Sequence, residues 1–249
     1  MNEETNIIAG RNPVFEAIKA RTEISSILVA RGSTEGTIKA IISTARKRKI
    51  PVKEVSPAKL DGLVPQGNHQ GVIALISPVE YHSLNDIFRK AEEMNEDPFI
   101  VILDGIEDVH NLGAIARTAE ACGVHGIIIP THRAAPITTA SVKASAGALM
   151  HIPVCRVTNI ATTIDELKKR NLWIAGADMK GSKSYYESDL RGPFALVIGG
   201  EGQGIRRLVL EKCDFTVNIP MKGRMSSLNA SNAAAVILFE VLRQRENAN

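Results

Sequence analysis

Short apolar runs alternate with helical stretches through the second half of the chain, and this alternation limits the possible folds more than any other feature. Phe99–Leu103 is continuously apolar, as expected for a strand in a sheet that is covered on both faces. Similar strand-like runs follow at Gly126–Pro130, Val154–Val157, Leu172–Ala177, Phe194–Ile198 and Phe215–Ile219. After the first run, one helical stripe is formed by Leu112, Ile115, Ala119 and Cys122. The pattern predicts an α/β fold with a largely parallel sheet and helices on both sides.

The first third of the chain predicts a smaller α/β unit. Asn12-Pro13 is expected to open its first helix, with Asn12 as the N-cap and Pro13 at the first helical position. Further strands and helices are expected at Ser25–Ala30, Thr37–Lys49, Val52–Val55, Pro57–Leu63 and Gly71–Ile76. A polar, helix-like stretch at Leu84–Met94 then interrupts the alternation. We predict a first domain at 1–77, a linker at 78–96 and a second domain at 97–249.

Composition indicates a globular protein of the cytoplasm. The 249 residues include 44% hydrophobic side chains, which is ample for a core. No run reaches the ~18–20 apolar residues of a membrane span, and the polar, acidic start does not resemble a signal peptide. The three cysteines, Cys122, Cys155 and Cys213, are far apart and form no C-x-x-C pair, so reduced thiols are expected.

Positive charge is concentrated in the first third of the chain. Residues 1–77 carry 11 Lys and Arg against 7 Asp and Glu, whereas residues 78–249 carry 19 against 20. The densest basic cluster is Arg46–Lys49. A solvated helix end explains this cluster as well as a phosphate-binding patch does, so both interpretations stay open at this point.

A glycine-rich loop follows the apolar run Phe194–Ile198, with glycines at 199, 200, 202 and 204. Their spacing does not fit the G-x-G-x-x-G dinucleotide motif. It does not fit a P-loop either, because Ile205-Arg206 stands where Lys-Ser/Thr is required. Four glycines in six residues, with Glu201 among them, favour a loop whose backbone closely approaches a ligand over a merely flexible connection.

Metal and hydrolase templates fail. The six histidines are scattered without H-x-x-x-H spacing, and there is no G-x-S-x-G elbow. Upstream of the glycine loop, Asn111 stands where a helix N-cap is expected. Arg117 points away from the apolar stripe of its helix, either solvated or paired with Glu120.

Three stretches of the second domain carry a family resemblance: LDGIEDVHNLGAIARTA, LVIGGEGQGI and IPMKGRMSSLNAS. In their order and spacing they resemble the three motifs of the SpoU (TrmH-type) branch of SPOUT RNA methyltransferases, over residues 97–245. The first third, with IIAGRNPVFEAI and GNHQGVIA, resembles the L30e-like substrate-binding domain of family members that methylate 23S ribosomal RNA, the RlmB type.

This resemblance implies a deep trefoil knot in the C-terminal part of the second domain. It also implies S-adenosylmethionine as cofactor, held largely by backbone groups of Gly199, Ile219 and Leu228, with Gly200 and Gly202 shaping the loop. It further implies a homodimer with the active site near the subunit interface, a 2′-O-methylated ribose as product, and no metal.

The positions that match the family's functional residues are Asn111, Arg117, Glu201, Ser227 and Asn229. Two positions depart from the family pattern: Val109 stands where proline is frequent, and Asn232 where a small apolar residue is common. The resemblance therefore puts Arg117 at the ribose hydroxyl, where it would orient or polarise the hydroxyl and hold the neighbouring phosphate, with the other four residues around the cofactor and substrate.

Methylation of a guanosine of 23S rRNA is the activity that the whole chain favours. A tRNA guanosine 2′-O-methyltransferase is disfavoured by residues 1–77, because such members usually lack the L30e-like domain. An antibiotic-resistance rRNA methyltransferase of the same family stays open. So does a non-catalytic rRNA-binding or ribosome-assembly protein, although the intact motif residues weigh against it. A Rossmann-type nucleotide enzyme is disfavoured by the glycine spacing.

Overall fold

The chain divides into two compact units in the computed structural model, which describes residues 7–33, 36–65 and 67–247. The first unit consists of Met1–Glu80 with Pro136–Ala140, and the second of Tyr81–Ala135 with Ser141–Asn249. The acidic start, residues 1–6, lies outside the described ranges. Within those ranges no helix is long and apolar enough to cross a membrane.

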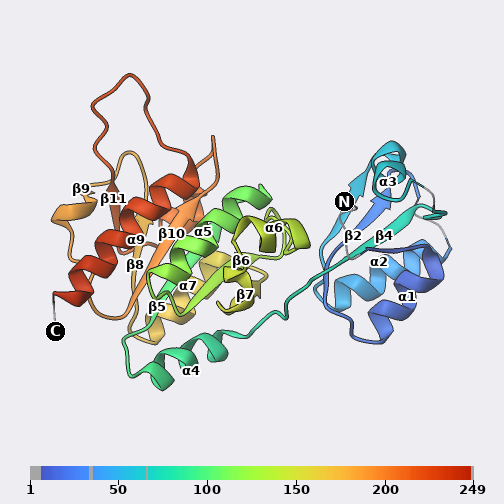
Figure 1. Cartoon of the computed structure of the whole chain (residues 1–249), viewed down its shortest axis with the longest axis horizontal. Coiled ribbons are helices and arrows are strands. Elements are labelled where there is room, and N and C mark those ends of the chain that lie inside the picture. Colours follow the sequence, from blue (N-terminus) through green and yellow to red (C-terminus); the bar gives the residue numbers. More distant parts are fainter. Residues whose placement is uncertain (1–6, 34–35, 66, 248–249) are drawn as a thin grey trace. The chain divides into compact units, whose positions relative to one another are not determined.

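The first unit is built on a four-stranded sheet with the order β1-β4-β2-β3 (Figure 1). Strand β4 pairs antiparallel with both β1 and β2, and β3 pairs parallel with β2. These strands are β1 (Ile7–Ala9), β2 (Ile24–Ala30), β3 (Val52–Val55) and β4 (Val72–Ile76). One face packs on α1 (Arg11–Lys19) and α2 (Thr37–Lys47), and the other on α3 (Pro57–Leu63).

The predicted N-cap of the first helix is wrong. Helix α1 begins at Arg11, and Gly10, not Asn12, is the cap residue. Gly10 has φ +99°, a conformation that glycine adopts readily, so the chain turns directly from β1 into the helix. Pro13 therefore falls at the third helical position, where its missing N–H costs nothing because no helical acceptor is available there.

The second unit contains a seven-stranded sheet in which every neighbouring pair is parallel, as predicted. The order is β7-β6-β5-β10-β8-β11-β9. The strands are β5 (Phe99–Asp104), β6 (Gly126–Pro130), β7 (Val154–Val157), β8 (Trp173–Ala177), β9 (Lys183–Ser184), β10 (Phe194–Gly199) and β11 (Phe215–Asn218). Figure 1 shows this sheet between helices, which confirms an α/β fold.

Helices cover both faces of the second sheet. One core cluster joins the strands to α4 (Leu84–Met94), α7 (Ile160–Lys169) and α8 (Arg207–Leu210). Helices α5 (Val109–Ala121) and α9 (Ala230–Glu246) pack on each other, and α9 also contacts β10. Two 3-10 turns, Ala148–Met150 and Tyr185–Glu187, complete the unit. The short α6 (Thr139–Ala144) begins in the first unit and ends in the second.

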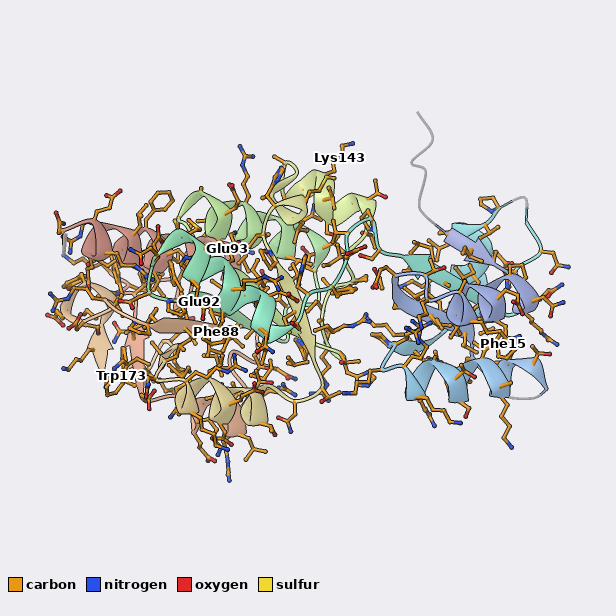
Figure 2. The ribbon with its side chains drawn as sticks, turned by 90° about the horizontal axis from the view of Figure 1, so that it is seen from below. Phe15, Phe88, Glu92, Glu93, Lys143 and Trp173 are labelled. Carbon is orange, nitrogen blue, oxygen red and sulfur yellow. The ribbon has the colours of Figure 1, made fainter. Side chains whose placement is uncertain are left out.

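Helix α4 lies within the predicted linker, yet it packs into the second core. Ile87 and Ala91 of α4 are buried, and a Cβ on Gly126 would lie 2.5 Å from the Ile87 side chain. Figure 2 labels Phe88 of this helix, whose ring lies 4.5 Å from the guanidinium of Arg170. The domain boundaries at 77 and 97 stay predictions.

Strands β5 and β10 are neighbours although about ninety residues separate them, with Gly199 opposite Asp104 in the register. The chain adds β6 and β7 on one side of β5, and β8 and β11 on the far side of β10. The order therefore reverses between β5 and β10, and such a reversal is where open α/β sheets bind ligands, beyond the carboxyl ends of the strands. The knot within this topology stays a prediction.

All three cysteines are free thiols of low reactivity. Burial raises the pKa of Cys122 and of Cys155 to about 11, and that of Cys213 to about 12. Because the thiolate is the reactive form, these side chains act as small apolar groups of the core.

Protonation of His125 is expected to destabilise the protein below about pH 6.5. Its ring is 0% exposed, and Nδ1 accepts the N–H of Phe99 at 2.9 Å. Burial lowers the pKa of His125, and Glu96, 3.3 Å from Nε2, opposes this only in part. The unfolded chain therefore takes up this proton more readily, so stability is complete above the unfolded pKa and is lost as the pH falls below it.

Urea unfolding of the wild type, His125→Gln and His151→Gln between pH 5 and 7.5 measures this effect. His151 is exposed and serves as the matched control. The free energy of unfolding should fall with decreasing pH in the wild type and the control, and less steeply in His125→Gln. Equal slopes in all three proteins would contradict the assignment.

Candidate active site

The glycine loop after β10 closes on itself. The N–H of Gly204 donates to the carbonyl of Gly200 at 2.9 Å. A Cβ on Gly199 would lie 2.2 Å from the carbonyl carbon of Gly204, and a Cβ on Gly200 would lie 2.2 Å from the oxygen of Gly105. Both positions therefore require glycine, because the protein's own chain packs against them. Close approach of this loop to a ligand stays a prediction.

An ion pair between the buried Asp104 and the partly exposed Arg206 ties this loop to the end of β5. The side chain of Asp104 is 0% exposed, and its carboxylate accepts the backbone N–H of Arg206 at 2.8 Å. The guanidinium of Arg206 donates from Nε and Nη2, each at 2.7 Å. The N–H of Gly200 also donates to the Asp104 carbonyl at 2.9 Å. Asp104 thus holds both ends of the glycine loop.

Helix α5 begins three residues earlier than predicted, and this changes the position of Asn111. Asp108 is the N-cap, and its Oδ1 accepts the N–H groups of His110 and Asn111, each at 2.9 Å. The prediction of Asn111 as N-cap is therefore wrong. Because Asp108 caps the helix, the Asn111 carboxamide lies in the first turn and is available for other partners.

Three segments far apart in the sequence meet at Glu201 through hydrogen bonds between side chains. Oε1 of Glu201 accepts Nδ2 of Asn111 at 3.0 Å and Nδ2 of Asn229 at 2.5 Å. Nδ2 of Asn229 also donates to Oδ1 of Asn111 at 3.0 Å. We call these three residues the Asn–Glu–Asn cluster. One member comes from each of the three motif stretches.

The orientation of both amides in the Asn–Glu–Asn cluster follows from the cap of α9. Asn229 is the N-cap of this helix, and its Oδ1 accepts the N–H of Ser231 at 2.9 Å. Since an N–H can only donate, Nδ2 of Asn229 must face the other two members. Asn111 must then turn Oδ1 toward Asn229 and Nδ2 toward the carboxylate. A helix cap thereby fixes the donor pattern of the cluster.

Arg117 and Ser227, the other two predicted functional side chains, lie apart from the cluster. Arg117 is exposed on α5, six residues beyond Asn111, which is about 9 Å along the axis and on another side of the helix. Ser227 is exposed in the long segment between β11 and α9. Within the described residues, neither side chain has a hydrogen bond or an ion pair. Arg117 is therefore solvated and does not pair with Glu120.

The predicted cofactor positions lie on two segments. Gly199, Gly200 and Gly202 belong to the glycine loop, where Gly202 is exposed with φ +80°. Ile219 and Leu228 lie in the segment from residue 219 to 229, which Figure 1 shows as a long excursion between β11 and α9. Leu228 is 37% exposed there.

A pocket of about 420 Å³ opens at the carboxyl ends of β5 and β10. This volume is within the usual range of small-molecule sites. The pocket is lined by Asn111 and Glu201 of the cluster, by Asp104 and Arg206 of the ion pair, and by Gly105, Ile106, Glu107, Asp108, Arg133, Gly200, Gln203 and Gly204. Sequence reasoning missed Asp104, Arg133 and Arg206. A signal was available for Asp104, because a carboxylate ending a continuous apolar run rarely lacks a partner.

Two family models match the chain. Residues 98–239 match the SpoU rRNA methylase family. Residues 7–82 match the family described as RNA 2′-O ribose methyltransferase substrate binding.

Individual relatives resemble nearly the whole chain. YacO of Bacillus subtilis (strain 168), named within the TrmH family of tRNA/rRNA methyltransferases, is 45% identical over 98% of each chain. The SpoU methyltransferase AviRb of Streptomyces viridochromogenes, solved in complex with AdoMet, is 29% identical, with a TM-score of 0.62 over 97% of this chain and 90% of its own. The A. aeolicus TrmH/SpoU tRNA modifying enzyme is also 29% identical, with a TM-score of 0.57 over 65% of this chain and 85% of its own.

Proposed function

Because the chain belongs to the SpoU rRNA methylase family, we propose that it transfers a methyl group from S-adenosylmethionine to the 2′-hydroxyl of a guanosine in 23S rRNA. One observation carries the proposal: the Asn–Glu–Asn cluster joins all three motif stretches at the edge of a pocket, where an open α/β sheet binds ligands. A chain that merely bound RNA would have no need to hold these side chains together beside a pocket.

The cofactor assignment is supported by the glycine loop and by the AviRb complex with AdoMet. The absence of Cβ atoms at Gly199 and Gly200 lets the loop pack closely on Gly204 and Gly105. The outer side of the loop, where Gly202 is exposed, is open for a ligand. Backbone groups of Gly199, Ile219 and Leu228 would hold the cofactor. When bound, it supplies a methyl group on a sulfonium, which is already a good leaving group.

The protein's task is then to make a ribose hydroxyl nucleophilic and to align it. Arg117 would orient and polarise the hydroxyl; it does not act as a free base, because a guanidinium keeps its proton in proteins. Asn111 would position the ribose, and Glu201 would hold Asn111 and the glycine loop in place. Ser227 and Asn229 would line the cofactor and ribose side. Such positioning is a large part of the catalysis of a two-substrate reaction.

The choice of 23S rRNA over tRNA is supported by the first unit. Its L30e-like resemblance and its match to a substrate-binding family cover a segment that tRNA-specific members usually lack. The likeness to the A. aeolicus tRNA modifying enzyme spans 65% of this chain. Residues 1–77 would bind the rRNA, and Arg46–Lys49 is the natural phosphate-contacting patch.

We further propose a cytoplasmic homodimer whose active sites lie near the subunit interface. Its support is the family resemblance together with exposed apolar side chains of the second unit: Phe239 of α9 is 54% exposed, and Trp173, labelled at the surface in Figure 2, is 61% exposed. Light scattering of the purified protein tests this state, with about twice the 26.9 kDa chain mass expected.

Transfer of tritium from labelled S-adenosylmethionine to RNA tests the function. The RNAs are 23S rRNA and total tRNA from a strain that lacks the gene, and label is expected in 23S rRNA at a ribose of guanosine. Label in tRNA alone would overturn the choice of substrate. No label in any RNA, together with no calorimetric binding of cofactor or its demethylated product, would favour a non-catalytic rRNA-binding protein.

A further inference from the structure

The loop after β6 carries an arginine that the proposed mechanism leaves unused. Arg133 lines the same pocket as Asn111 and Glu201. It is exposed, its backbone is left-handed with φ +57°, and within the described residues its guanidinium has no hydrogen bond or ion pair. Arg206, which also lines the pocket, is already committed to Asp104.

Two sets of hydrogen bonds hold the Arg133 loop over the pocket. At its start, the N–H and Oγ1 of Thr131 donate to the carbonyl of Val157 at 2.8 and 3.1 Å. At its end, the N–H of Ala135 donates at 2.7 Å to the carbonyl of Ile106, which itself lines the pocket. Arg133 lies between these two anchors. The backbone hydrogen bonds on either side of Arg133 therefore fix its position at the pocket.

Of the two arginines that line the pocket, Arg133 is the one without a carboxylate partner among the described residues, so it is the side chain there that can bind an anion. Four carboxylates also line the pocket: Asp104 pairs with Arg206, Asp108 and Glu201 accept neutral N–H groups, and Glu107 is exposed. A guanidinium without a partner can donate two parallel hydrogen bonds to two oxygens of one phosphate. In RNA, a phosphate is attached to the carbon next to the one that carries the 2′-hydroxyl.

We propose that Arg133 binds the backbone phosphate adjacent to the ribose that is methylated, and so sets the position of that ribose over Asn111. The inference rests on the proposed function. An alternative anion is the carboxylate of the cofactor. It is disfavoured because the pocket is not lined by Ile219 or Leu228, the cofactor positions outside the glycine loop. Arg133 then holds the phosphate, which leaves Arg117 to act on the hydroxyl.

Salt dependence of RNA binding tests this assignment with the full-length protein. Removing one phosphate contact should reduce the slope of log K against log salt by about 0.7 to 0.9. For Arg133→Gln we expect this change, together with RNA binding weakened roughly 10- to 100-fold at low salt, the scale of a charged hydrogen bond. Arg133→Lys should keep the slope and recover part of the affinity. Calorimetric binding of S-adenosylmethionine should not change in either variant.

Arg207→Gln is the matched control. Arg207 is exposed and close in sequence to the pocket, but it pairs with Glu211 at 3.0 Å and does not line the pocket. Its salt slope should equal that of the wild type. A wild-type slope in Arg133→Gln, or weaker cofactor binding without a change in slope, would overturn the proposal.

The RNA used is whichever of 23S rRNA and tRNA the wild type methylates, and 23S rRNA if it methylates neither. The wild type's choice of RNA thus decides the proposed substrate, while the slope of the variant on that RNA decides the role of Arg133. The two failures are therefore distinguishable.

Discussion

Replacing Arg117 with Ala is expected to lower kcat for methyl transfer by roughly 10²- to 10³-fold, the scale of removing one positioned donor from a transition state. Cofactor affinity should stay unchanged, because Arg117 lies outside both the glycine loop and the segment 219–229. The thermal midpoint should also stay near that of the wild type, since the side chain is exposed and makes no hydrogen bond or ion pair within the described residues. Single-turnover transfer of labelled methyl groups, with calorimetry alongside, measures both.

Arg117→Lys is the matched variant for this test. It keeps the positive charge and loses the planar fork, so only partial recovery is expected if geometry matters. Full recovery would reduce the role of Arg117 to charge alone. Unchanged kcat in Arg117→Ala would contradict a catalytic role altogether.

The position of Arg117 adds a second measurement. It does not line the pocket that contains Asn111 and Glu201 of its own chain. In a homodimer with active sites near the interface, this residue could act on the pocket of the partner subunit. Inactive Arg117→Ala protein can then be mixed with inactive Glu201→Ala protein. Each mixed dimer would contain one intact site, formed by Glu201 of one chain and Arg117 of the other. Because about half of the dimers are mixed, methyl transfer should recover to at most about half an active site per dimer. No recovery would place the action of Arg117 within its own chain.

The sheet of the second unit was predictable because buried parallel strands are written as continuous apolar runs. Phe99–Leu103 and Phe194–Ile198 need no partner to be recognised, since both faces of such strands are covered. No short stretch of the sequence predicts the pairing of β5 with β10. It depends on which strands meet after the whole chain has folded, so no strand order was predicted.

Helix starts were the least predictable feature, and the site depends on one of them. Asp108 and Asn111 are both good cap residues, and sequence alone does not choose between them. The fold chooses Asp108, which releases the Asn111 side chain toward Glu201. At α1 the same competition is won by Gly10, because a positive φ is needed there. Arg133 carried no signal at all, since its importance comes from a pocket built by other segments.

Substituting any one member of the Asn–Glu–Asn cluster is expected to lower kcat nearly as much as substituting two members. Glu201→Ala removes the acceptor that holds both amides, so Asn111 loses its orientation even though it is unchanged. We expect kcat to fall roughly 10²-fold in Glu201→Ala, comparable to losing one positioned polar group. The double variant with Asn229 should be little worse, because residues that act as a unit are strongly non-additive.

The substitution chosen at Asn229 decides whether the double-mutant cycle with Glu201 measures only the interaction between the two side chains. Asn229→Ala would also remove the cap of α9, which costs about 1 kcal/mol of stability. Asn229→Ser keeps an oxygen for the N–H of Ser231 and removes only the donor to Glu201 and Asn111. Asp165→Asn is a remote control, since Asp165 pairs with Lys212 at 2.8 Å and does not line the pocket.

The measured quantity is the coupling free energy between Glu201→Ala and Asn229→Ser in kcat. A value of about 1–3 kcal/mol is expected for side chains in one hydrogen-bonded network. Coupling between Glu201→Ala and Asp165→Asn should be near zero. If the effects of Glu201→Ala and Asn229→Ser on kcat simply add, each residue acts separately. The hydrogen bonds of the cluster would then follow from the packing of three segments and would not position the substrate.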